Sequence, residues 1–153
     1  MTPVAMYSQI IREGGASIVC HAMKEDDIKT FYQQPWVAVA SDGGIGMQHP
    51  RGAGTFPRVL GVYVRERHWL TLEEAIHKMT GLPASRLKLT DRGEIKKGAF
   101  ADLVLFNPDT VKDNSTFSEP QKIATGIEKV FVNGTLVWDG GKSTGALPGR
   151  VVN

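Results

Sequence analysis

The amino-acid sequence predicts an α/β fold for residues 1–90, followed by short antiparallel strands in residues 91–153. In the first part, apolar runs of strand length alternate with segments whose apolar residues recur at helical spacing. The runs Ala16–Cys20 and Trp36–Ala40 carry no charge, which is typical of parallel strands buried on both faces. Strand, helix and strand in that order indicate an α/β arrangement, and the change of pattern predicts a domain boundary near residue 90.

Helices are predicted where apolar residues gather on one face of a helical repeat. Thr71 followed by Glu74 is a capping box, and Gly81 ends the helix that it begins. Proline suits the first turn of a helix, which favours a short helix from Pro83. The predicted helical segments are Thr2–Arg12, Lys24–Gln34, Phe56–Arg67, Thr71–Met79 and Pro83–Leu87.

Residues 91–153 contain three β-like runs, Ala101–Phe106, Ile127–Val132 and Thr135–Trp138. Asn133-Gly134 lies between the last two and is a strong signal for a hairpin turn. The polar segment Asn107–Pro120 predicts a long loop, and the glycine-rich tail from residue 140 is expected to be exposed. A few strands and helices of this kind cannot satisfy all their own edges and faces. We therefore expect this segment to have evolved within a larger folded protein.

Composition excludes several functional classes. The formal net charge is +2 and the basic residues are scattered, so neither nucleic-acid nor membrane-surface binding is indicated. Apolar runs fall far short of the roughly 20 residues of a membrane span. The first residues do not resemble a signal peptide, and the single cysteine fits a reducing compartment, so a cytoplasmic location is expected. The sequence has no Walker loop and no Gly-x-Gly-x-x-Gly, so nucleotide binding is not indicated, and it has no Gly-x-Ser-x-Gly nucleophile motif. It also has no His-x-His, so no complete metal site is predicted.

The segment Ala40-Ser41-Asp42-Gly43-Gly44 directly follows the predicted strand Trp36–Ala40. An acid at the carboxyl end of a barrel strand would face the active site, and the glycines permit a sharp turn beside a ligand. Asp42 is therefore a candidate catalytic acid or base. An Asp-Gly pair after a strand is also a common turn or helix cap, and the residues alone leave both interpretations open.

The following loop, residues 48–58, offers Arg51 as a candidate ligand for a substrate carboxylate, because a guanidinium can donate two parallel hydrogen bonds. The alternative is an arginine that pairs with a nearby acid or caps a helix. His21 follows an apolar run, where a ligand at a strand end would lie, yet a lone histidine is more often structural. Cys20 lies within an apolar run, which favours an inert thiol.

These same residues resemble the N-acyl-D-amino-acid deacylases, or D-aminoacylases, of the amidohydrolase superfamily. The block from His49 to Gly61 is specific to that family, whereas many amidohydrolases share the segment from Asp91 to Val104. The resemblance covers nearly the whole chain and is carried by Ser41-Asp42-Gly43, His49–Gly61, Leu72–Thr80, Asp91–Val104, Val130–Gly134 and Pro148–Arg150.

The resemblance implies a metal-dependent (β/α)8 barrel with a small β-sandwich assembled from both ends of the chain. Residues 1–90 would hold the last strands and helices of the barrel, and residues 91–153 the C-terminal share of the sandwich. A zinc-type ion in such enzymes polarises the amide carbonyl and lowers the pKa of its bound water to about 7. Asp42 would by resemblance take the proton from that water and deliver it to the departing amine, while Arg51 holds the α-carboxylate of the N-acyl-D-amino acid.

Members of this family draw their metal ligands from earlier strands, so the resemblance assigns no metal ligand to His21 or Cys20. We therefore expect the isolated chain to be inactive. Two alternatives remain: an amidohydrolase acting on cyclic amides, and a non-catalytic folded module that forms homo-oligomers through unpaired strand edges.

Overall fold

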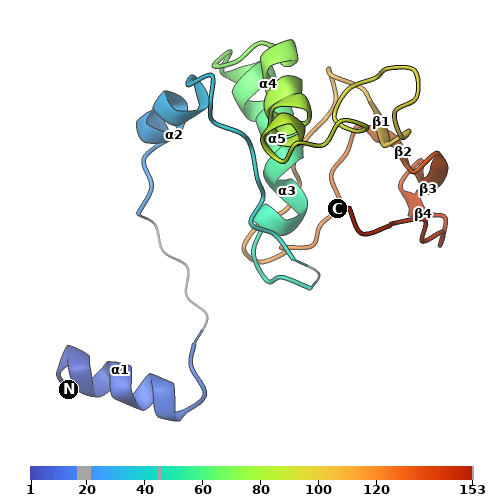
Figure 1. Cartoon of the computed structure of the whole chain (residues 1–153). Coiled ribbons are helices and arrows are strands. Elements are labelled where there is room, and N and C mark those ends of the chain that lie inside the picture. The colour runs from blue at the N-terminus through green and yellow to red at the C-terminus, as the bar shows by residue number, and fades with distance from the viewer. Residues whose placement is uncertain (17–21, 45, 153) are drawn as a thin grey trace.

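The computed structural model describes residues 1–16, 22–44 and 46–152, and its elements form a helical part and a sheet (Figure 1). Cys20, His21 and all but the first residue of the predicted strand Ala16–Cys20 lie outside the described residues. The helices are α1 Pro3–Arg12, α2 Glu25–Tyr32, α3 Arg51–Arg58, the π-helix η1 Val59–Glu66, α4 Leu72–Met79 and α5 Gly81–Arg86. The strands are β1 Leu103–Phe106, β2 Ile127–Val132, β3 Thr135–Asp139 and β4 Lys142–Ser143.

Local signals account for how α1 and α4 begin. Thr71 Oγ1 accepts the Glu74 backbone N–H at 3.1 Å, and Glu74 Oε2 accepts the Thr71 N–H at 2.8 Å. This is the predicted capping box, which satisfies two otherwise unpaired N–H groups at the start of α4. Thr2 caps α1 in a simpler way, with Pro3 in the first turn. All five predicted helices are confirmed, with shifted ends.

The predicted helix Phe56–Arg67 is longer than expected, since α3 starts at Arg51 and continues into η1 without a break. Pro57 lies inside this helix and has no backbone N–H to donate. In η1 the backbone hydrogen bonds join residues five apart instead of four, which is the π-helix pattern, as in Arg67 N to Val62 O at 2.9 Å.

The hydrophobic core lies around η1. Tyr63 stacks on Trp69 with ring centroids 4.7 Å apart and planes inclined by 5°, and it also contacts Tyr32 of α2. The core residues are Val39, Val59, Leu60, Tyr63, Leu70, Ala75 and Val111. Val111 is 0% exposed although it comes from the polar segment Asn107–Pro120, so this loop contributes to the core. In the described part of the chain, α1 has no buried residue and lies apart from the other elements (Figure 1).

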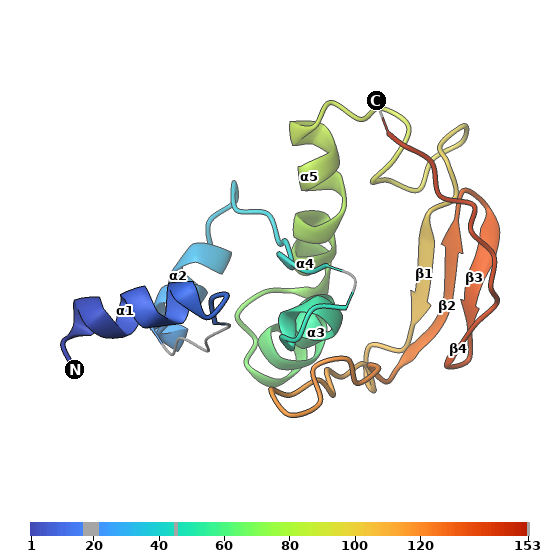
Figure 2. The same cartoon turned by 90° about the horizontal axis from the view of Figure 1, so that it is seen from below.

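The four strands form one antiparallel sheet in the order β1-β2-β3-β4, beside the helices (Figure 2). The turn between β2 and β3 is made by Asn133 with φ 48° and Gly134 with φ 79°, as its Asn-Gly sequence predicts. Arg92 secures this hairpin by donating to the Asn133 side chain at 2.9 Å and by pairing with Asp102. Asp102 in turn accepts the Asn133 backbone N–H at 2.7 Å.

The prediction that Trp36–Ala40 is a strand is wrong. This segment pairs with no strand in the described residues, and it is held instead by α4. The Val39 N–H donates to the Lys78 carbonyl at 3.0 Å, while the Lys78 ammonium donates to the carbonyls of Gln34 and, at 3.1 Å, Val37. A strand requires a hydrogen-bonded neighbour, and the described part of residues 1–90 supplies none.

The α/β expectation therefore holds only in its coarse form, as helices combined with an antiparallel sheet. No parallel pairing occurs among the residues that the structure describes. None of the described helices is long and apolar enough to cross a membrane.

Candidate functional site

The structure brings the two predicted site residues, Asp42 and Arg51, into direct contact. Arg51 Nη2 lies 3.1 Å from Asp42 Oδ2, and Arg51 Nε donates to the Asp42 backbone carbonyl at 3.1 Å. The side chains remain open to solvent, with Asp42 87% and Arg51 41% exposed. The alternative interpretation of Arg51, an arginine paired with a nearby acid, also describes this geometry, and that acid is the other candidate residue.

Asp42 reaches Arg51 through a tight turn. Its φ of 46° places it in the left-handed region, which is uncommon for a residue other than glycine. The Ser41 hydroxyl accepts the Gly43 N–H at 3.1 Å across the turn. A Cβ on Gly43 would lie 2.9 Å from the Gly52 Cα, so only glycine lets this turn approach the start of α3. Of the two glycines predicted to shape the site, Gly43 thus has a defined steric reason, whereas a Cβ on Gly44 would meet no neighbour within 4 Å.

Arg51 itself is held by the residues around the start of α3. His49 Nδ1 accepts the Arg51 backbone N–H at 3.1 Å, so a neutral His49 carries its proton on Nε2. The Thr55 hydroxyl donates to the Arg51 carbonyl at 2.9 Å. Arg51 is thus restrained through both its backbone and its guanidinium group.

Sequence reasoning missed the contribution of the segment Asn107–Pro120, which was predicted only as a long loop. The Ser115 hydroxyl lies 2.9 Å from the Pro50 carbonyl oxygen, directly before Arg51. The ring of Phe117 meets the His49 ring edge to face, with centroids 5.1 Å apart. Asp113 followed by Ser115 is the local signal for the turn, because the Asp113 side chain accepts the Ser115 N–H at 2.9 Å.

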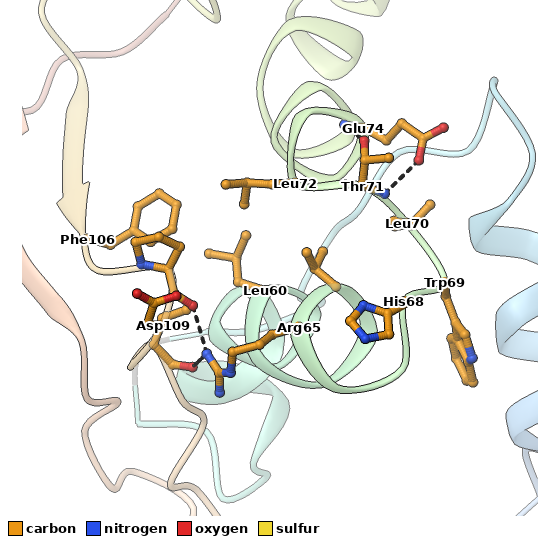
Figure 3. A pocket seen from close by; sticks show the side chains of 13 residues that line it. Leu60, Arg65, His68, Trp69, Leu70, Thr71, Leu72, Glu74, Phe106 and Asp109 are labelled. Carbon is orange, nitrogen blue, oxygen red and sulfur yellow. Dashed lines mark hydrogen bonds between the residues drawn. The ribbon is translucent and has the colours of Figure 1, made fainter.

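A groove of about 500 Å³ lies elsewhere, between η1, the start of α4 and the end of β1 (Figure 3). Leu60, Leu72 and Phe106 face it, and Arg65 spans its edge to donate to the carbonyls of Pro108 and Val111 at 2.9 and 2.7 Å. Neither Asp42 nor Arg51 lines this groove. The candidate site is therefore an exposed pair at a turn, distinct from this apolar groove.

The described residues contain no group of three His, Cys, Asp or Glu side chains that could hold a metal ion. Asp42 has a cationic neighbour, Arg51, and a backbone turn around it. Divalent zinc needs about four converging donors. The residues around the pair therefore do not fit a metal centre by themselves.

Comparison with known proteins identifies related sequences. The family model described as "Amidohydrolase family" matches residues 4–138. The chain is 44% identical over 145 residues to an N-acyl-D-aspartate deacylase of Alcaligenes xylosoxydans xylosoxydans, covering 94% of this chain and 29% of the relative. It is 44% identical over 139 residues to a D-aminoacylase of the same organism, covering 90% of this chain and 29% of that protein. The chain thus spans less than a third of the length of these curated relatives.

Two crystal structures are similar to the described fold. One is a D-aminoacylase with 44% sequence identity and a TM-score of 0.78, matched over 81% of this chain and 27% of that one. The other is an N-acyl-D-glutamate deacylase from Bordetella bronchiseptica, complexed with zinc and a phosphonate that mimics the tetrahedral intermediate. It is 45% identical, with a TM-score of 0.73, over 78% of this chain and 27% of that structure.

Proposed function

The chain belongs to the amidohydrolase family, as its sequence predicts, and we propose that it is the C-terminal part of a hydrolase that deacylates N-acyl-D-amino acids. The observation that carries this proposal is the contact between Asp42 and Arg51, which brings the proposed proton-transfer group beside the proposed carboxylate-binding group. The similarity to an N-acyl-D-aspartate deacylase, a D-aminoacylase and an N-acyl-D-glutamate deacylase of Alcaligenes xylosoxydans xylosoxydans supports the substrate class.

Asp42 acts in this proposal as the proton shuttle. Its carboxylate is open to solvent at a turn held by Ser41 and Gly43, so both water and a substrate can reach it. The carboxylate takes a proton from the attacking water and returns it to the nitrogen of the amide bond as that bond breaks. The products are a carboxylic acid and a D-amino acid.

Arg51 binds the α-carboxylate of the substrate. An exposed ion pair such as Asp42–Arg51 contributes only about 0.2–1 kcal/mol, so a substrate carboxylate can replace Asp42 at small cost. The exchange also frees the Asp42 carboxylate for proton transfer, while Arg51 Nε keeps its hydrogen bond to the Asp42 backbone. Binding and proton transfer are then linked through one guanidinium group.

Zinc is present in the related N-acyl-D-glutamate deacylase. The described residues of this chain do not form a zinc site by themselves, and the roles of Asp42 and Arg51 involve no step through the metal. We place the zinc ligands of the whole enzyme outside these residues. The isolated chain should then show no deacylase activity, and zinc-dependent turnover by it would contradict this assignment.

Residues 1–90 form, in this proposal, the end of a (β/α)8 barrel, and residues 91–153 the C-terminal share of a small β-sandwich. The helices and the antiparallel sheet lie on different sides of the molecule, which supports this division, while Val111 of the second segment packs in the core around η1 (Figure 2). A cytoplasmic location remains a prediction.

The test is a hybrid enzyme in which residues 1–153 replace the matching C-terminal segment of the Alcaligenes N-acyl-D-aspartate deacylase. With zinc added, we expect hydrolysis of N-acetyl-D-aspartate, N-acetyl-D-glutamate or N-acetyl-D-methionine, and none of their L-enantiomers. Asp42→Asn should lower kcat by about 10²–10⁴-fold. Arg51→Lys should mainly raise KM, because lysine cannot present two parallel N–H donors.

Arg12→Lys in the exposed helix α1 is the matched control and should leave both constants unchanged. An active hybrid that retains full kcat with Asp42→Asn would refute the role of Asp42. Turnover of a hydantoin in preference to the linear amides would favour the cyclic-amide alternative.

A second candidate function is that of an oligomerising module, favoured by the edge strand β1. Leu103, Val104 and Leu105 are 37%, 54% and 49% exposed, and in the described sheet β1 pairs only with β2. An exposed apolar edge of this kind invites pairing with a second copy. Light scattering should then show oligomers that Val104→Lys dissociates, whereas Val151→Lys in the exposed tail should not. A monomeric parent chain would exclude this function.

A further inference from the structure

The loop Val111–Phe117 packs against Gly54 and Gly61, along one side of the continuous helix α3–η1. A Cβ on Gly61 would lie 2.8 Å from the Val111 carbonyl oxygen. A Cβ on Gly54 would overlap the side chains of Asp113 and Ser115. Both overlaps show that the loop packs directly on the helix backbone, which only glycine allows.

The loop is fixed at its near end by the core. Val111 is fully buried, and its carbonyl accepts a hydrogen bond from Arg65 Nη1 at 2.7 Å. Asp113 lies largely buried beside Arg58, at 3.7 Å from its guanidinium group. Lys112 and Thr125 pair across the base of the loop with backbone hydrogen bonds of 3.0 and 3.1 Å. This segment is therefore held at several points.

The far end of the loop contacts the two residues before Arg51. The Ser115 hydroxyl lies within hydrogen-bond distance of the Pro50 carbonyl oxygen, at 2.9 Å, and of Asp113 Oδ1, at 2.7 Å. The edge-to-face contact with Phe117 orients the His49 ring, and His49 Nδ1 accepts the Arg51 N–H. The position of Arg51 thus depends on contacts from a segment more than 60 residues further along the chain.

We infer that the loop Val111–Phe117 positions Arg51 for carboxylate binding, with Ser115 and Phe117 as its positioning residues. The kinetic effect expected here rests on the proposed function, because Arg51 is the proposed ligand of the substrate carboxylate. Neither residue touches substrate in this assignment. They act through Pro50 and His49, so their loss weakens substrate binding while leaving proton transfer by Asp42 intact.

The kinetic test uses the hybrid enzyme with four variants. Ser115→Ala removes the hydroxyl beside Pro50, and Phe117→Leu removes the aromatic edge beside His49. Each should raise KM for the N-acetyl-D-amino acid about three- to tenfold at unchanged kcat, the range expected for one hydrogen bond or aromatic contact. Phe117→Tyr keeps the ring, and Ser118→Ala removes an exposed hydroxyl whose partner is Thr116, so both should behave as the parent.

A second measurement uses the isolated chain and needs no activity. Hydrogen exchange followed by NMR reports the Arg51 and Gly54 amides, which donate to His49 and Pro50. Ser115→Ala and Phe117→Leu should accelerate their exchange, whereas amides of α4 should exchange as in the parent.

The two measurements separate the inference from the proposed function. Unchanged KM and unchanged exchange in both loop variants, in a hybrid where Arg51→Lys still raises KM, would overturn the inference and leave the function standing. An inactive hybrid, or one insensitive to Arg51→Lys, would overturn the function instead. Exchange of the Arg51 amide would still decide whether the loop positions this residue.

Discussion

Replacing Gly61 with alanine tests whether the long loop packs on the helix backbone. The added Cβ would lie 2.8 Å from the Val111 carbonyl oxygen, well inside ordinary van der Waals contact. That oxygen cannot easily withdraw, because Arg65 Nη1 binds it at 2.7 Å and Val111 itself is fully buried. We expect Gly61→Ala to destabilise the folded chain.

The magnitude follows from comparison with Gly52→Ala in α3. A Cβ on Gly52 would meet its nearest atom, Met47 Cβ, at an ordinary 3.7 Å. In both variants, replacing a helical glycine with alanine should raise the free energy of unfolding by about 0.5–1 kcal/mol. Only Gly61→Ala also incurs the overpacking cost of about 1–3 kcal/mol. The gain is common to both variants, so the difference between their free energies of unfolding isolates the overlap at about 1–3 kcal/mol.

Urea unfolding followed by circular dichroism measures this difference if both variants keep the m-value of the parent chain. Gly52→Ala should raise the midpoint and Gly61→Ala should lower it relative to Gly52→Ala. Equal midpoints for the two variants would refute the close approach of the loop to the helix. A changed m-value in one variant would indicate an altered unfolded or native state, and the comparison would then rest on hydrogen exchange.

Three further predictions concern single residues. Thr71→Ala removes the capping box and should lower the free energy of unfolding by about 1 kcal/mol in the same urea assay, whereas an effect near zero would show that α4 does not need its cap. Asn133→Ala forces a left-handed φ of 48° on a residue with no amide side chain and should cost about 1–2 kcal/mol, while Asn133→Gly should cost less; the reverse order would contradict the turn geometry. Burial lowers the pKa of Lys78 below its ordinary value of 10.5, and the carboxylate of Glu74 opposes this shift only in part. At pH values between the lowered folded-state pKa and 10.5, the unfolded chain holds more protons at Lys78 than the folded chain does. The free energy of unfolding should therefore rise with pH in this window relative to Lys78→Met; a flat difference between the two proteins would argue against a buried ammonium.

Local features of the fold were predictable because neighbouring residues determine them. Thr71 and Glu74 lie three positions apart and satisfy each other's backbone, whatever packs against α4. Asn133-Gly134 forms its hairpin turn because these residues tolerate positive φ better than others. The family, too, was recognisable from the block His49–Gly61, and the family match confirms it.

Non-local features escaped prediction. The apolar run Trp36–Ala40 has the composition of a buried strand, but strand formation depends on a neighbour, and the described residues bury Val39 against α4 instead. The polar composition of Asn107–Pro120 indicated a solvated loop. One residue of this segment, Val111, nevertheless lies in the core, and the loop that follows it packs closely on two helix glycines, Gly54 and Gly61.

The sequence by itself determined the capped starts of α1 and α4 and the hairpin turn, and it singled out both candidate site residues. These follow from backbone chemistry within a few positions, or from a motif that keeps its spacing. Only the tertiary structure decided that Asp42 and Arg51 touch, and that Ser115 and Phe117 support the start of α3. The Asp42–Arg51 contact depends on the turn that brings the two residues together at the surface. The contacts of Ser115 and Phe117 depend on how distant chain segments pack, and that packing is a property of the whole fold.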